Sequence, residues 1–173
     1  MSTPLLGDPA SMSALGATLR RTAVRLSADG EDLTADLDDA SSGWRGPRAL
    51  ELRRRTATAA EQTTAIAAAL DDSGRALQAA ATDLAAAIAH LRELEDAATA
   101  MGLALREGAV TRGWGITGIA DAELLHDEDR QRERLQERVH QAVTTLGRRR
   151  ARLTGDLTHA SELLARASAR LRE

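Results

Sequence analysis

Three pairs of a carboxylate and a histidine three residues further on resemble a metal-binding pattern most closely: Glu123 with His126, Glu137 with His140, and Asp156 with His159. On a helix, this spacing places both side chains of a pair on one face, as in helical di-metal proteins. Those proteins take their pairs from different helices. Here successive pairs are 14 and 19 residues apart on one expected helix, about 21 Å and 28 Å. We therefore expect solvated surface pairs and no metal site.

No other arrangement in the sequence supports catalysis. The chain contains no cysteine, so it has neither a thiol nucleophile nor a thiolate ligand. No serine or threonine is flanked by a suitable base and orienting group, and no glycine loop follows a strand as phosphate binding requires. His90 falls beside an apolar helical stripe, where we expect a flank or core residue. The sequence predicts no enzyme activity and no cofactor.

Arginine clusters offer a second kind of chemistry, the binding of anions. The densest runs are 148–150 with Arg152, and 53–55. Three consecutive helical residues point in different directions, so neither run makes a single docking stripe. The formal net charge is −3, and acidic residues are interleaved with the arginines. We expect solvated, ion-paired faces and no nucleic-acid binding; a helical membrane-surface or DNA-coating protein is the weakest alternative.

The composition indicates an all-α fold. The 173 residues include 36 Ala and 25 Leu, but no Phe, Tyr, Lys or Asn, and only two Trp. Alanine and leucine are strong helix formers, whereas sheets depend on β-branched and aromatic residues. A sheet is nearly excluded on these grounds.

Two long helices are expected before residue 108. The first spans about Ser11 to Ala40, with a predicted seam at Leu15, Leu19, Leu26, Leu33, Leu37 and Ala40. Pro47 is a favoured residue type for the start of the second. One heptad phase then runs from Ala60 to Leu105, and it stays in register through Asp71-Asp72-Ser73-Gly74, so this helix should be continuous.

The remaining chain predicts a loop and a third helix. Residues 108–120 hold four glycines and read as a compact glycine-rich loop. Residues 121–173 form the third long helix, with a seam from Leu135 to Leu171 that includes Arg149. We expect an elongated antiparallel hairpin at 1–107, on which the third helix folds back in coiled-coil-like packing.

Neither a membrane span nor a cleaved secretory signal is expected. No segment approaches about 18 uninterrupted apolar residues. Residues 1–10 lack a basic stretch followed by an apolar run. Export, if it occurs, would use a route that does not read such a signal.

The short connection between the first two helices contains Trp44-Arg45-Gly46. A Trp-x-Gly turn between two long amphipathic helices resembles the WXG-type (ESAT-like) family of helical hairpins exported by type VII (ESX) secretion systems. The likeness covers about residues 8–105. The third helix brings the chain closer in size to larger substrates of that pathway, such as PPE proteins and the targeting domains of LXG-like toxins.

The resemblance implies a non-enzymatic type VII substrate, secretion partner or targeting domain. It would pair helix on helix with another WXG-type protein, as a heterodimer or homodimer, and a secretion ATPase or chaperone could also bind it. It would be secreted or held at the cell surface. Trp44 and Gly46 form the WXG turn, and Trp114 is a candidate partner anchor.

One element of the family is missing. Family pairs carry a Tyr-x-x-x-Asp/Glu export signal on one partner, and this chain has no tyrosine. Leu125 and Asp129 form the nearest imitation. The resemblance therefore implies the partner that travels with a tyrosine-bearing chain. The main rival hypothesis is a cytosolic coiled-coil adaptor or chaperone whose Trp-x-Gly is coincidental.

Overall fold

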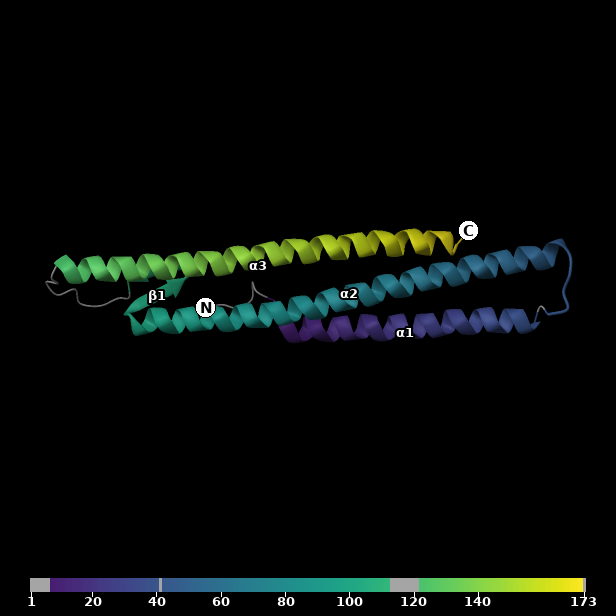
Figure 1. Cartoon of the computed structure of the whole chain (residues 1–173), viewed down its shortest axis with the longest axis horizontal. Helices are drawn as coiled ribbons and strands as arrows, with labels where there is room; N and C mark the ends of the chain where they lie inside the picture. Colours follow the sequence, from purple (N-terminus) through teal and green to yellow (C-terminus); the bar gives the residue numbers. More distant parts are fainter. Residues whose placement is uncertain (1–6, 41, 113–121, 173) are drawn as a thin grey trace. The chain divides into compact units, whose positions relative to one another are not determined.

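The computed structural model describes residues 7–40, 42–112 and 122–172, and most of them are helical. In chain order the elements are α1 (Pro9–Ala40), α2 (Pro47–Ala100), β1 (Leu103–Arg106), β2 (Ala109–Arg112) and α3 (Ala122–Arg170). The expected helix-rich fold with three long helices is confirmed (Figure 1).

The chain divides into two compact units that do not follow sequence order. The first contains Met1–Pro9 and Ala81–Ala151, and the second contains Ala10–Ala80 and Arg152–Glu173. The long helices α2 and α3 each contribute one part to both units.

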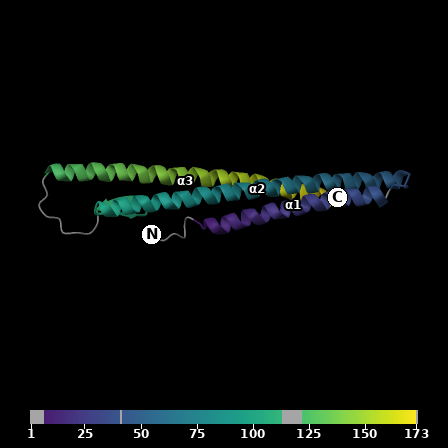
Figure 2. The ribbon, with the colours of Figure 1, turned by 60° about the horizontal axis from the view of Figure 1, so that its bottom comes forward.

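In the second unit, α1 runs antiparallel to the first part of α2, and both views show the two helices side by side (Figures 1 and 2). Gly16 approaches Gly74, and Gly30 approaches Thr63, so residue numbers rise on α1 as they fall on α2. The buried residues of α1 are Gly16, Ala23 and Gly30, one every seven residues. Such small residues let the two backbones come close.

This packing corrects the seam predicted for α1. Leu15 is 52% exposed and Leu33 is 45% exposed, whereas Ala23 is 4% exposed. Because Gly16 and Gly74 allow a closer approach than leucines could, α1 turns its glycine–alanine stripe toward α2. The leucines lie along one edge of that contact.

The continuity predicted for α2 is confirmed, since one helix runs from Pro47 to Ala100. The Ser73 hydroxyl donates a 2.7 Å hydrogen bond to the carbonyl of Ala69, so this buried serine is satisfied within the helix. The heptad phase is confirmed as well, and its deeply buried members within α2 include Ala67, Leu77, Ala81, Leu84, Leu91 and Ala98.

The first unit has its own core, in which α3 packs against the second part of α2. The core cluster comprises Leu91, Leu94, Ala98, Leu105, Val110, Leu135 and Val139. Ala98 and Val139 are almost completely buried, at 0% and 1% exposure. Leucine and valine thus supply the bulk that aromatic residues supply in most cores.

A small antiparallel hairpin, β1–β2, completes this core and corrects two predictions. The second helix does not reach residue 107, because Gly102 takes a φ of +67° two residues after Ala100, where α2 ends. Residues 109–112 of the expected loop form a strand; 113–120 lie outside the described residues. Glu107 and Gly108 make the turn with φ values of +52° and +83°, both positive as a type I′ hairpin turn requires.

The predicted end of the second helix was too late for a physical reason. Leu105 keeps the heptad phase of α2, and Leu-Ala-Leu-Arg has strong helix propensity. In the structure Leu105 instead pairs across the hairpin with Val110, and both side chains are buried against α3. Tertiary packing has overridden local propensity here.

Candidate partner-binding surfaces

The Trp-x-Gly turn between α1 and α2 leaves its tryptophan exposed. Trp44 is 60% exposed, so most of its indole is not used in the core. Its carbonyl accepts a 3.3 Å hydrogen bond from Arg53 Nη2. Gly46 has a φ of +112°, which residues with a Cβ rarely adopt, and nothing lies within 4 Å of a Cβ placed there. The glycine is therefore required by backbone conformation and not by space.

Further apolar side chains are exposed on both helices, next to the turn at the start of α2 and along the length of α1. Leu50 and Leu52, at the start of α2, are 55% and 39% exposed. On α1, Leu15, Leu19, Leu26, Leu33 and Leu37 form what we call the leucine flank. All five are half-buried or exposed, and none is among the buried residues of α1. The flank and Trp44 together offer apolar area that the second unit does not cover.

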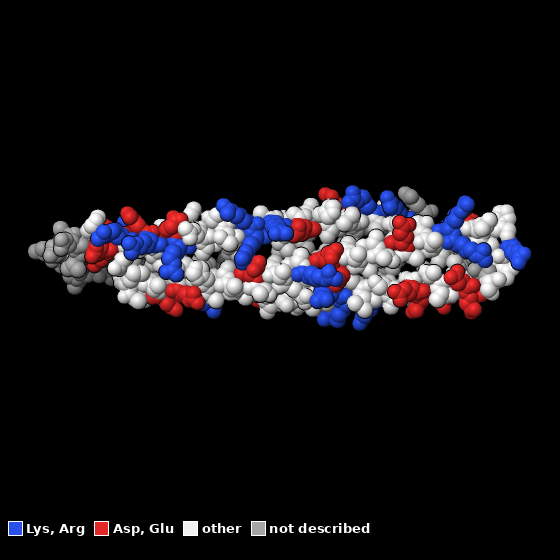
Figure 3. All heavy atoms as spheres, viewed as in Figure 1, with Lys and Arg blue, Asp and Glu red and all other residues white. Residues whose placement is uncertain are grey.

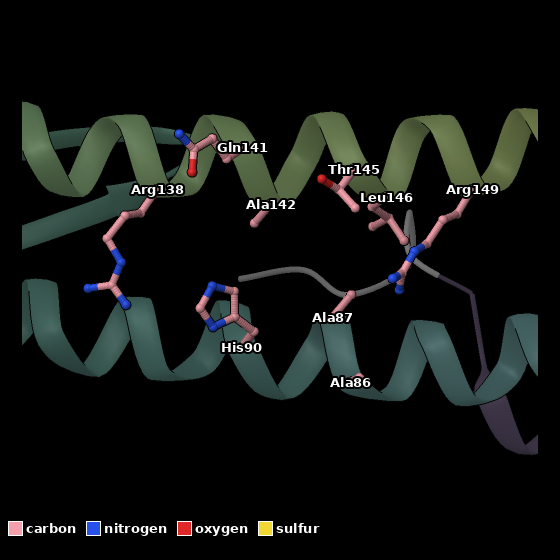
Figure 4. Close-up of a pocket in the computed structure, with 9 residues that line it drawn as sticks. All are labelled: Ala86, Ala87, His90, Arg138, Gln141, Ala142, Thr145, Leu146 and Arg149. Carbon is pink, nitrogen blue, oxygen red and sulfur yellow. The ribbon is translucent and has the colours of Figure 1, made fainter.

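A separate groove lies between α2 and α3 within the first unit (Figure 4). This hollow of about 380 Å³, here called the α2–α3 groove, has an apolar floor of Ala86, Ala87, Ala142 and Leu146. Its polar rim consists of His90, Arg138, Gln141, Thr145 and Arg149. Helical rise separates the two rim arginines by about 16 Å along α3.

The rim carries cationic groups at both ends. Arg149 Nη1 lies 3.0 Å from Asp83 Oδ1 on α2, and His90 Nδ1 lies 3.3 Å from Glu93 Oε2. Arg138 points across the groove toward α2 in Figure 4 and is in no ion pair with the described residues. It is the groove's one uncompensated charge among those residues, and an anionic group would complement it.

Charge is distributed unevenly along the helices. In Figure 3 acidic side chains gather over the carboxyl-terminal half of α1, and arginines gather over the middle of α3. Residues 29–39 contain six acids and no base, whereas 138–155 contain five arginines and no acid. Neither imbalance is visible in the net charge of −3.

The other predicted site residues have different outcomes. Trp114, the candidate anchor, lies outside the described residues. Leu125 belongs to the first turn of α3, and its side chain also falls outside them. Asp129 Oδ1 lies 3.2 Å from Arg112 Nη2 on β2 and 3.4 Å from Arg132 Nη2. Asp129 therefore ties the hairpin to α3.

The carboxylate–histidine pairs remain separate on α3. His126, His140 and His159 are all exposed. Among the described residues, no group of three His, Cys, Asp or Glu side chains is placed to hold a metal ion. Within the same ranges, no helix is long and apolar enough to cross a membrane.

Sequence reasoning missed the groove. Arg149 was expected in the apolar seam of the third helix, but its side chain is 50% exposed and reaches α2 through Asp83. An arginine at an otherwise apolar heptad position was the feature of the sequence that could have indicated a polar contact between α2 and α3. His90, expected at a flank or in the core, is 44% exposed at its side chain and lines the rim.

Comparison of the chain with protein-family models, curated proteins and solved structures finds no match.

Proposed function

We propose that this chain is a non-enzymatic interaction protein of a type VII (ESX) pathway, acting as a substrate, a secretion partner or a targeting domain. The observation that carries the proposal is the exposed Trp44 on a turn whose Gly46 has a φ of +112°. A bulky aromatic side chain held in solvent by a specialised turn is a typical anchor for a protein partner.

The leucine flank supplies the rest of the contact. A second helical protein laid along α1 would cover Leu15 and Leu33 while the glycine–alanine stripe stays packed on α2. Burial of leucine side chains stabilises such a contact at about 25 cal/mol per Å² of apolar surface. Another WXG-type helical hairpin has the shape to do this, and the complex would leave the cell without a cleaved signal peptide.

Replacement of Trp44 tests the proposal. The full chain is co-expressed with a small WXG-type protein encoded beside its gene, and both co-purification and appearance in the culture medium are followed. Trp44→Ala should abolish both, while circular dichroism shows unchanged helicity because Trp44 is mostly in solvent. Val143→Ala is the matched control, since Val143 is 50% exposed on α3 and should change neither.

The opposite result identifies the rival function. If Trp44→Ala pairs and is exported like the parent chain, or if neither protein reaches the medium, the type VII assignment is wrong. If the parent chain pairs with the WXG-type protein but neither protein is exported, a cytosolic adaptor or chaperone is favoured.

A further inference from the structure

We propose that the α2–α3 groove binds the acidic end of α1 from a second copy of this chain. Arg138, at one end of the groove, is in no ion pair with the described residues. Self-association through this contact does not rest on the proposed export pathway. It shares Leu33 with the surface proposed above for a WXG-type partner, so the two partners would compete for that part of α1.

The proposed occupant is an acidic stripe on α1, formed by Asp29, Asp32, Asp36 and Asp39. Their spacings of three, four and three residues place them on one face of the helix. All four are exposed, and none is in an ion pair with the described residues. The stripe is therefore available while the glycine–alanine stripe of α1 stays packed against its own α2.

The stripe and the groove match in length. From Asp29 to Asp39 the helix rises about 15 Å, and from Arg138 to Arg149 it rises about 16 Å. Carboxylates along one helix can therefore reach Arg138 at one end of the groove and Arg149, which already pairs with Asp83, at the other. Such charge-assisted hydrogen bonds are the stronger kind, and they fix the register of a contact.

The apolar parts also match. Leu33 stands beside the stripe and is 45% exposed. The groove offers a floor of alanines together with Leu146, and these small side chains leave room for a helix to approach. A leucine on this floor with carboxylates at the rim reproduces the usual pattern of an apolar centre within a polar border.

A second observation on α1 supports an external partner for its acids. Asp38 and Asp39 lie in the last turn of the helix, which has no basic residue. Carboxylates are unfavourable there because the helix dipole places negative charge at its carboxyl end. Arginines from a second copy would relieve this repulsion, and no described residue of the same chain is ion-paired with these acids.

The contact joins two different surfaces, so two copies could satisfy both contacts reciprocally, or successive copies could form a longer series. In either case the full chain should show a mass above 18.4 kDa that rises with protein concentration. Because the contact is ionic and partly exposed, it should weaken about tenfold between about 0.05 and 0.5 M salt, as the Debye length shortens. Sedimentation equilibrium measures both effects.

Charge reversal at each side tests the specific contact. Arg138→Asp and Asp36→Arg should each weaken self-association at least about tenfold, since each brings like charges together. Neither residue is ion-paired within the described chain, so circular dichroism should show intact helices. An equimolar mixture of the two variants should recover association, because each surface then meets an opposite charge.

Matched controls separate this contact from general charge effects. Arg54→Asp repeats the arginine-to-acid reversal at a position outside the groove. Glu31→Arg repeats the acid-to-arginine reversal on the other side of α1 from Asp36. Both should associate like the parent chain. The proposal is overturned if the parent chain is monomeric at low salt, if the controls weaken association equally, or if the mixture does not recover. A groove that binds only a different protein, with the chain alone monomeric, also overturns it.

Discussion

A Cβ placed on Gly16 would lie 2.6 Å from the backbone oxygen of Gly74, and a Cβ placed on Gly74 would lie 2.6 Å from that of Gly16. The relationship is reciprocal because the two glycines face each other where α1 crosses α2. Carbonyl oxygens within a helix cannot move aside as a flexible side chain can. The separation of the two helices is therefore set at this point by the absence of side chains.

Gly74→Ala should lower the free energy of unfolding by about 1–3 kcal/mol, because the added methyl group forces the helices apart. Urea denaturation followed by circular dichroism measures this change. Gly147 and Gly155 on α3 are the matched controls, since nothing lies within 4 Å of a Cβ at either position. Alanine there should raise stability by about 0.5–1 kcal/mol through helix propensity. Equal effects at all three sites would contradict the close crossing.

The turn before α2 gives a prediction based on backbone conformation alone. Gly46→Ala should lower the free energy of unfolding by about 1–2 kcal/mol, because alanine is strained at a φ of +112°. Gly43→Ala should stay within about 0.5 kcal/mol of the parent, since Gly43 has neither a positive φ nor a close neighbour. Chemical denaturation of both variants provides the comparison. A neutral Gly46→Ala would show that the turn adapts.

Much of the helical architecture could be predicted from residue types and their period. Pro47 marks the start of α2, and the unbroken heptad phase through Gly74 shows that this helix continues. The face that α1 buries was not predictable in this way, because a hydrophobicity pattern favours Leu15 over Gly16. Close backbone packing reverses that preference, and it depends on a second glycine 58 residues away.

The β1–β2 hairpin and the α2–α3 groove could not be predicted from the sequence for a related reason. Leu105 fits both a helical heptad and a strand, and only its pairing with Val110 over α3 decides between them. The charge on the rim of the groove depends on which arginines find an acidic partner once α2 and α3 pack together. Asp83 and Arg149 are 66 residues apart in the sequence, so no local sequence pattern predicts the 3.0 Å contact between their side chains. The position of Trp44 in the connection between the first two helices, in contrast, was predictable from the sequence.

Asp129 links β2 to α3, and its replacement separates a structural role from an export role. Asp129→Asn should lower the free energy of unfolding by less than about 1 kcal/mol, because its ion pairs with Arg112 and Arg132 are partly exposed. Thermal unfolding measures the loss. Asp127→Asn is the control, since among the described residues Asp127 pairs only with Arg130 on its own helix. Loss of export for Asp129→Asn alone, at this small cost in stability, would assign the Leu125–Asp129 segment to the export signal.

Gln136 on α3 holds the hairpin turn through both ends of its side-chain amide. Its Oε1 accepts a 2.7 Å hydrogen bond from the Val110 N–H, and its Nε2 donates a 2.9 Å hydrogen bond to the Gly108 carbonyl. Gln136→Ala leaves both backbone groups without this partner, so the free energy of unfolding should fall by about 1–3 kcal/mol. Hydrogen exchange at the Val110 amide should accelerate in parallel. Gln141→Ala removes an exposed hydrogen bond to Glu137 on the same helix and should change neither quantity. An unaltered exchange rate of the Val110 amide in Gln136→Ala would show that Gln136 does not hold the hairpin turn.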